Sequence, residues 1–174
     1  MLKPPINKLG FTLIELLVVI AVIGLVTTIA VTMLNAARVK ARNAQRNVDI
    51  VQLKKAFELA VDNTGGALPS SGGLNDWACV SSGCYGNFIG SITANATVDS
   101  ALAPYIKKPA DPIDSSRQNR GYIYSSQSVG FGLKGPGAYL IWFLENESVT
   151  ATVCGLGTYA WSVYNSMMCY FKFD

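Results

Sequence analysis

Glu15 is a single carboxylate inside an apolar run that extends from Phe11 to Ala30. An acid near the centre of a bilayer costs about 2.5 to 3.5 kcal/mol, so a membrane segment that keeps one needs a partner for it. A cut after Gly10 would give Phe11 a free amino group about one helical turn before Glu15. The residues therefore predict a carboxylate–amine interaction that depends on cleavage between Gly10 and Phe11. The alternative is a shallow acid whose side chain reaches the lipid headgroups.

The first ten residues differ in kind from the run that follows. The stretch MLKPPINKLG is polar and basic, contains two prolines and ends in Gly10. A peptidase needs an extended, accessible backbone, which a glycine before a helix offers. A secretory signal peptide is the alternative, but its apolar part has about 7–15 residues and a small-residue cleavage site follows it. Phe11–Ala30 is longer and lacks that site, so we expect residues 1–10 to be a cleaved basic leader.

The apolar run has the length of a membrane span. Twenty residues from Phe11 to Ala30 rise about 30 Å as a helix, which matches the hydrocarbon thickness of a bilayer. We therefore expect a transmembrane helix over residues 11–32. The chain contains no histidine, which excludes histidine-dependent hydrolysis and histidine-ligated zinc. Because no nucleophile–base pair is visible either, we expect no enzyme activity and no cofactor.

The stretch KLGFTLIELLVVIAVIGLV resembles the N-terminus of type IV pilins and of the related pseudopilins of type II secretion. The resemblance covers Lys8 to about Ala60. It implies that a prepilin peptidase cleaves between Gly10 and Phe11 and N-methylates Phe11. It also implies that Glu15 pairs with the N-terminal amine of a neighbouring subunit during filament assembly, so that residues 11–32 form an assembly helix as well as a membrane anchor.

All the cysteines lie beyond the apolar run, at Cys79, Cys84, Cys154 and Cys169. An even count on one side of a membrane segment favours disulfides in an oxidising compartment. Three pairings are possible, and we favour the sequence-local one, Cys79–Cys84 with Cys154–Cys169. Four buried free thiols are the alternative interpretation.

Asp111 and Asp114 lie in a polar, proline-bearing loop. Two carboxylates there could supply oxygen ligands to calcium, and the resemblance to pseudopilins adds a precedent for calcium in a head loop. Solvated turn formers are the more ordinary interpretation of such residues, so no metal site is assigned.

The helical pattern continues without a breaker as an amphipathic segment over residues 33–62. Its apolar positions change side near residue 50. An alanine-rich stripe comes first, and we expect it to face other helices in a filament; it consists of Leu34, Ala37, Ala41, Ala44 and Val48. A second set follows, and we expect it to dock against a sheet; it consists of Ile50, Leu53, Phe57, Ala60 and Val61. Gly65 and Gly66 then end the helix.

Residues 63–174 have the composition of a β-rich head with disulfides. The stretch from Gly65 to Cys84 is rich in turn residues and is expected to be loop, and Asp99–Ser100 could cap a short helix. Alternating and β-branched or aromatic residues predict strands at Tyr122–Ser125, Val129–Leu133, Ala138–Glu145, Thr150–Cys154, Thr158–Tyr164 and Met168–Phe173. Ala138–Phe143 is almost wholly apolar and is expected to be the central strand, packed on the helix.

The sequence thus predicts an α+β fold, in which a long N-terminal helix packs on a C-terminal antiparallel sheet as in pilins. The resemblance implies a structural subunit of a type IV pilus, or fimbrium, or of a pseudopilus. Its expected partners are copies of itself and other pilins, a prepilin peptidase and membrane assembly machinery. The head shows no clustered basic face, so direct nucleic-acid binding is not expected.

The location of the head follows from two opposing signals. Bases after the run at Arg38, Lys40, Arg42 and Arg46 outnumber those of the leader, which would keep the C-terminal side in the cytoplasm. The cysteines indicate export, and long domains cross membranes largely regardless of charge, so we expect an extracytoplasmic head and a cell-surface or periplasmic filament. The alternative function is a monomeric, single-pass anchored binding module.

Overall fold

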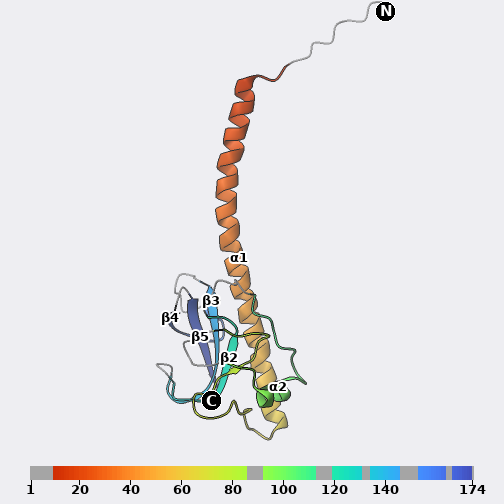
Figure 1. Cartoon of the computed structure of the whole chain (residues 1–174), viewed down its shortest axis with the longest axis vertical. Coiled ribbons are helices and arrows are strands. Elements are labelled where there is room, and N and C mark those ends of the chain that lie inside the picture. Colours follow the sequence, from red (N-terminus) through yellow and green to blue (C-terminus); the bar gives the residue numbers. More distant parts are fainter. Residues whose placement is uncertain are drawn as a thin grey trace, which may run out of the picture. The chain divides into compact units, whose positions relative to one another are not determined.

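The computed structural model describes residues 10–85, 92–112, 119–130, 134–145, 153–163 and 166–173. The chain divides into two compact units, residues 1–38 and 39–174. The first unit contains the N-terminal part of helix α1 (Leu13–Asn63), and the second, called the head below, contains the rest of that helix and the sheet (Figure 1).

Helix α1 ends where the glycines predicted that it would. Gly65 has a φ of 77° and Gly66 a φ of 103°, which are left-handed values that glycine adopts without strain. The backbone N–H of Gly66 donates to the carbonyl of Val61 at 2.9 Å. This bond satisfies a carbonyl that the helix leaves unpaired and reverses the chain after Asn63.

The part of α1 inside the head buries the face that the sequence predicted. Ile50, Leu53, Phe57 and Ala60 are each at most 2% exposed, whereas Val61, the last residue of the predicted set, is half-buried. The four buried residues share one core with residues of the sheet and with Val98. Fully burying one such side chain contributes about 1.5 to 3 kcal/mol, so this face holds the helix to the head.

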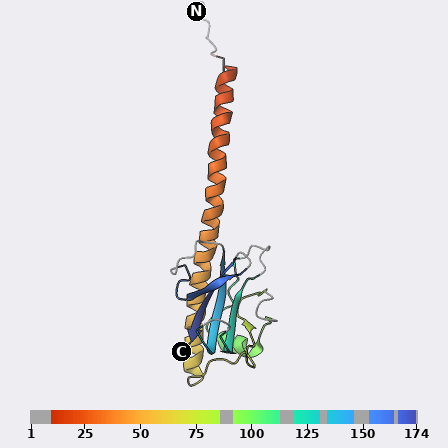
Figure 2. The same cartoon turned by 90° about the vertical axis from the view of Figure 1, so that its left-hand side faces the viewer.

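The sheet has five antiparallel strands in the order β1-β2-β3-β5-β4. Figures 1 and 2 show β2, β3 and β5 side by side next to the later part of α1. The bounds are β1 Ala78–Cys79, β2 Tyr122–Ser128, β3 Gly137–Glu145, β4 Thr158–Val163 and β5 Ser166–Phe173. The α+β architecture predicted from the sequence is thereby confirmed.

Strand β3 is the central strand, and it is buried on both faces. Leu140 and Trp142 belong to the core that contains α1, whereas Ile141 and Phe143 belong to a second core with Trp77. Successive side chains of a strand point to opposite faces, so a nearly continuous apolar run is what a doubly covered strand requires. The predicted role of Ala138–Phe143 is confirmed.

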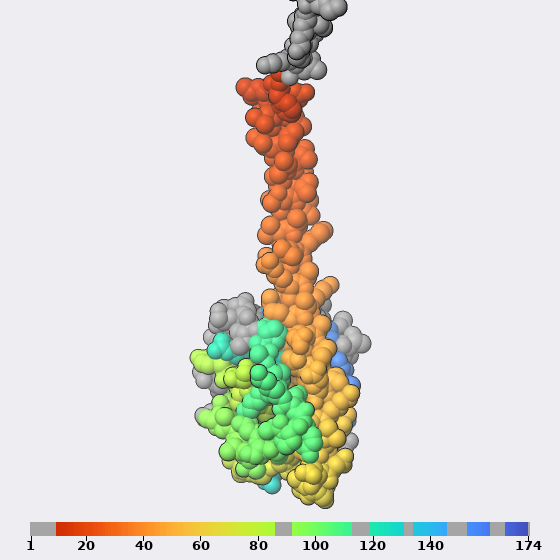
Figure 3. Space-filling view, turned by 90° about the vertical axis from the view of Figure 1, so that its right-hand side faces the viewer, coloured from red at the N-terminus to blue at the C-terminus, as the bar shows by residue number. Residues whose placement is uncertain are grey.

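A short helix and its following segment lie beside α1 on one face of the head, which Figure 3 shows in space-filling form. Helix α2 (Ala96–Leu102) is capped by Asn95, whose side-chain oxygen accepts from the N–H of Val98 at 3.1 Å. The predicted cap at Asp99–Ser100 is therefore wrong. Asp99 lies inside the helix, and its carboxylate pairs with Lys108 at 2.7 Å.

One loop prediction and two strand predictions need correction. The segment expected to be only loop contains β1, a two-residue strand paired with β2. Val129 and Gly130 lie outside any strand because Gly130, at φ 95°, packs against the backbone of Gly135. Val153 and Cys154 form a turn rather than a strand. The remaining residues of these two predictions, 131–133 and 150–152, lie outside the described part of the chain, as does Tyr164.

Candidate functional site

The start of α1 brings the predicted processing and assembly residues together. Gly10 and Phe11 precede the helix and are exposed, Phe11 at 77%. Apart from Gly10 and its chain neighbours, no atom of the described residues lies within 4 Å of the position that a Cβ on Gly10 would occupy. The backbone at this junction is thus non-helical and open, which is the form that a peptidase requires. Residues 1–9 of the leader lie outside the described residues.

Glu15 bonds to the residue that follows Phe11. Its Oε2 atom accepts from the backbone N–H of Thr12 at 2.9 Å and from the Thr12 hydroxyl at 2.7 Å. The hydroxyl oxygen of Thr12 accepts in return from the N–H of Glu15 at 3.3 Å. This reciprocal arrangement is a capping box, in which two otherwise unpaired helical N–H groups find acceptors.

The capping box is a function of Glu15 that the sequence analysis missed. The signal was present, because Thr12-Leu13-Ile14-Glu15 has the S/T-x-x-E spacing immediately before an apolar run. Among the described residues, both hydrogen bonds to the carboxylate end on Oε2 and none on Oε1. Glu15 can therefore cap its own helix and still accept a further donor on its second oxygen.

The rest of this unit presents an apolar surface. From Leu13 to Leu34 the large hydrophobic side chains are between 46% and 81% exposed. The hydroxyls of Thr27, Thr28 and Thr32 donate to carbonyls three or four residues earlier in the same helix. Each hydroxyl thus has an acceptor without water, as a lipid environment demands. By length and composition this helix can cross a membrane.

Residues 6–31 match the family model of the prokaryotic N-terminal methylation motif. The chain carries the hallmark of type IV pilin and pseudopilin precursors. The matched region includes the open junction, the capping box and most of the exposed apolar helix. This pilin-type motif belongs to a structural family and not to an enzyme family. Comparison of the chain with curated proteins and with solved structures finds no match.

The pilin-type motif and the N-terminal apolar helix together fit a membrane-anchored precursor. The head of this precursor has two disulfides, Cys79–Cys84 and Cys154–Cys169. They are the sequence-local pairs that the spacing favoured. The first closes a loop beside β1, and the second ties β5 to the turn that precedes β4.

Both carboxylate oxygens of Asp111, one of the calcium candidates, already accept hydrogen bonds within the protein. One of its oxygens accepts from Arg46 Nε at 2.6 Å, and the other accepts from the N–H of Gly121 at 2.6 Å. Asp114, the second calcium candidate, lies outside the described residues. Within the described residues no group of three potential metal ligands gathers. The role of Asp111 is therefore to balance the charge of a buried arginine.

Arg46 is the centre of a charged cluster in the head that the sequence analysis did not anticipate. It is 2% exposed and contacts Asp111, Glu145 and the carbonyl of Pro112. Arg42, one helical turn earlier, also pairs with Glu145. The i,i+4 spacing of the two arginines was the only signal that they share a face.

A second polar contact joins α1 to β2. The hydroxyl of Tyr122 donates to Asp49 Oδ2 at 2.7 Å, and both residues are buried. Burial, and then the hydrogen bond to the Asp49 carboxylate, raise the pKa of Tyr122 above its usual range. The phenol therefore stays neutral wherever the head is folded, and it supplies a permanent donor to the acid.

Proposed function

We propose that this chain is a structural subunit of a type IV pilus or pseudopilus filament. It is made as a membrane precursor, cleaved after Gly10, N-methylated at Phe11 and polymerised through its N-terminal helix. The observation that carries the proposal is Glu15. Its carboxylate lies beside Thr12 at the start of an exposed apolar helix. Among the described residues no donor bonds to its Oε1 atom, which can therefore accept a hydrogen bond from another copy.

Cleavage supplies the missing donor. Removal of the leader leaves a primary ammonium on Phe11, and a single methylation converts it to a secondary ammonium with one positive charge and two N–H donors. The amine of an incoming copy can bond to Oε1 of a copy already in place while Oε2 keeps its own helix capped. An ammonium–carboxylate contact in a low-dielectric setting is strong, so it can select the axial position of each new copy.

The exposed apolar surface supports the same proposal. A helix that merely anchors a head needs lipid on all sides, and capping alone uses only Oε2 of Glu15, so Oε1 keeps no donor among the described residues. Copies that pack their helices together bury apolar side chains and Glu15 at once. In the assembled filament the helix would lie in the interior with the heads outside, on the cell surface or in the periplasm.

The second candidate is a monomeric anchored module whose head binds a ligand. The helix alone would suit it. The methylation motif over residues 6–31 favours the filament, because modification of a new N-terminus serves no purpose in a simple anchor.

Mass spectrometry of the protein in shear-released surface material tests the processing step. We expect a mature chain that begins with N-methyl-Phe11 and contains both disulfides. Filaments whose subunits retain residues 1–10 would overturn the processing step, and absence of this chain from any filament fraction would overturn the filament role.

A pair of substitutions separates the two roles of Glu15. Glu15→Gln keeps a side chain that can close the capping box but removes the negative charge, so we expect normal membrane insertion and at least tenfold fewer filaments (about 1.4 kcal/mol or more lost per contact). Thr12→Val removes the capping hydroxyl and keeps the charge, so we expect a weaker helix start and near-normal filament numbers. Equal yields from Glu15→Gln and the unchanged protein would remove the amine-pairing role.

A further inference from the structure

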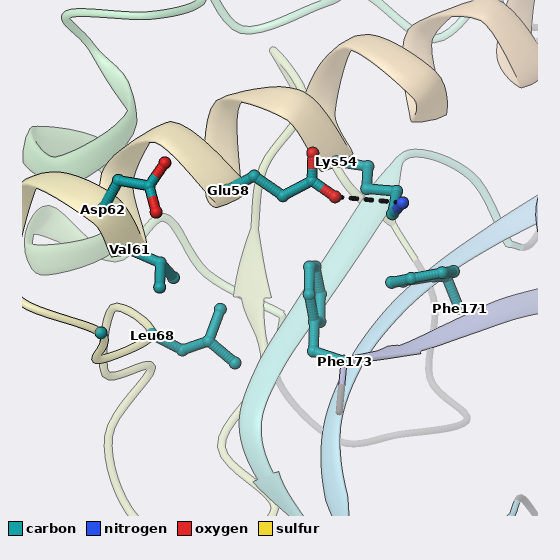
Figure 4. Close-up of a pocket in the computed structure, with 8 residues that line it drawn as sticks. Lys54, Glu58, Val61, Asp62, Leu68, Phe171 and Phe173 are labelled. Atoms are coloured by element: carbon teal, nitrogen blue, oxygen red, sulfur yellow. Dashed lines mark ion pairs between the residues drawn. The ribbon is translucent and has the colours of Figure 1, made fainter.

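A groove lies between the last turns of α1 and the end of β5 in the head. It has a volume of about 430 Å³, and Glu58, Val61 and Asp62 line it from the helix. Phe171 and Phe173 line it from the strand. Figure 4 shows the Phe173 ring extending from β5 toward the helix and the Phe171 ring near the Lys54 side chain. The groove therefore combines aromatic rings with carboxylates, which is the chemistry that holds a basic side chain.

The aromatic side of the groove is fixed by the core. The ring of Phe173 packs at 5.3 Å from that of Phe57, which is fully buried, and at 5.1 Å from that of Phe171. The two rings are thus held in place before anything binds. A preformed surface loses little conformational entropy on binding, so even a small contact there can be productive.

One lysine of the chain already uses this chemistry. The ammonium of Lys54 lies 5.1 Å from the centre of the Phe171 ring and 3.0 Å from a carboxylate oxygen of Glu58. Figure 4 shows this ion pair at one end of the groove, with Val61 and Leu68 on the other side of Phe173. The far end of the groove likewise has a carboxylate near an aromatic ring, with Asp62 in the place that Glu58 takes at the first end.

Asp62 is the part of the groove that lacks a partner. It is exposed, and within the described residues no hydrogen bond or ion pair satisfies its carboxylate. It also lies in the last turn of α1, where no basic residue is present. The C-terminal end of a helix carries partial negative charge, so an acid there is unfavourable until a cation approaches.

We propose that this end of the groove binds Lys40 from a second copy of the chain. The inference rests on the filament proposed above, because a monomer offers no second copy. The ammonium of Lys40 would pair with Asp62, and its methylene groups would lie against Phe173 and Leu68. The interaction would join the part of α1 at which the head of one subunit begins to the groove in the head of another.

Lys40 is suited to this role by its surroundings. It is exposed and has no hydrogen-bond or ion-pair partner among the described residues. Its helical neighbours at i−4, i−3 and i+4 are Ala36, Ala37 and Ala44, which are all exposed. Small side chains around a lysine let its helix approach another surface closely. Charge complementarity also holds, because no acid occurs between Glu15 and Asp49.

The two proposed contacts of a subunit involve different neighbours. Pairing Phe11 of one copy with Glu15 of another requires parallel helices offset by four residues, which is about 6 Å. Bringing Lys40 level with Asp62 requires an offset of 22 residues, which is about 33 Å. A filament that makes both contacts joins each subunit to one copy at a small axial offset, through Phe11 and Glu15, and to another copy at a larger axial offset, through Lys40 and Asp62.

Charge exchange in the full-length chain tests the groove. Asp62→Lys and Lys40→Glu should each lower the amount of shear-released filament roughly tenfold, because attraction becomes repulsion at every contact. The double variant should recover to within about threefold of the unchanged protein, since the pair is restored in reverse. Lys55→Glu is the matched control, because it makes the same charge change on an exposed helical lysine outside the groove.

A photo-crosslinking amino acid at Leu68 gives an independent readout. We expect cross-links from assembled filaments to peptides that contain residues 36–44 of another copy. Normal filament yield from Asp62→Lys, no recovery in the double variant, or cross-linking without residues 36–44 would each overturn the groove contact. If such filaments still begin with N-methyl-Phe11, the filament proposal stands and only the groove contact fails; absence of filaments from the unchanged protein would instead remove the proposed function.

Discussion

Helix α1 passes through two very different environments along one continuous element. From Leu13 to Leu34 its large apolar side chains are exposed, and its polar groups bond only within the helix. From Asn43 to Ala60 it buries eight residues in the head, including Arg46 and Asp49. The first region is stable only with lipid or other copies around it, whereas the second is stabilised by its own tertiary contacts. Substitutions in one region should therefore leave the other unchanged.

The largest effect is expected at Arg46. Arg46→Met would leave Asp111 buried without its cation and Glu145 with Arg42 as its remaining ion-pair partner, so we expect the free energy of unfolding of the head to fall by about 3–5 kcal/mol. Denaturant titration of the purified full-length protein in detergent micelles, followed by the fluorescence of the buried Trp77 and Trp142, measures this. Arg38→Met is the control, because Arg38 is exposed; equal losses from both variants would contradict the comparison.

A pair of leucines gives the apolar counterpart. Leu53 is 1% exposed, and Leu53→Ala should lower the stability of the head by about 2–5 kcal/mol through lost burial and a cavity. Leu25 is 65% exposed, and Leu25→Ala should leave the same fluorescence transition within about 0.5 kcal/mol of its position. A shift of similar size in the Leu25 variant would show that the two regions unfold together.

Loss of a disulfide is expected to have the next largest effect on the stability of the head. Replacing Cys154 and Cys169 by alanine opens a link with a sequence separation of 15 residues, and the chain-entropy model gives a loss of about 3 kcal/mol. Replacing Cys79 and Cys84, separated by five residues, should cost about 1 kcal/mol less because the closed loop is shorter. Membrane insertion should be normal in both variants, and the reverse order of stability losses would contradict the loop-length argument.

The smallest effect concerns the buried phenol. Tyr122→Phe removes a donor to Asp49, which still accepts from Gln45 at 2.8 Å, so we expect a loss of about 1–2 kcal/mol at neutral pH. Because the folded pKa of Tyr122 is raised, the unfolded chain releases this proton first as the pH increases. The stability of the head should therefore fall above about pH 10, the ordinary tyrosine pKa.

The same titration contains its own control. Burial also raises the pKa of Tyr124. The Tyr122→Phe variant should therefore still lose stability above about pH 10, but with a shallower slope than the unchanged protein. Unfolding transitions measured from about pH 8 to pH 11 decide this. Parallel slopes for the variant and the unchanged protein would show that Tyr122 does not contribute.

The sequence predicted those features that depend on periodicity or on a dedicated residue type. Leu53 and Phe57 recur with the helical period, and Ala138–Phe143 is too apolar to be anything but a covered strand, so both placements followed directly. Strand β1 has two residues, which is too short for any alternation to be visible. Its position is set by pairing with β2, a contact between distant parts of the chain.

Charged residues were harder to place for a different reason. Arg46 was counted only among the bases after the apolar run, and nothing in the sequence analysis predicted its burial, which for arginine requires a partner. Its partners, Asp111 and Glu145, are 65 and 99 residues away along the chain. At the candidate site the signal was local, because Thr12 and Glu15 are three residues apart with the spacing of a capping box, yet this role of Glu15 was missed.

The strand order has a consequence for the timing of folding. Strand β5, the last described strand, inserts between β3 and β4, so the sheet stays incomplete until residues 166–173 have been synthesised. The apolar face of α1 around Phe57 is made more than 100 residues earlier. During that interval this face lacks the part of its cover that β5 provides, including Phe173, and non-local pairing of this kind is slow. A nascent subunit thus passes through a period in which protection by a chaperone would raise its yield.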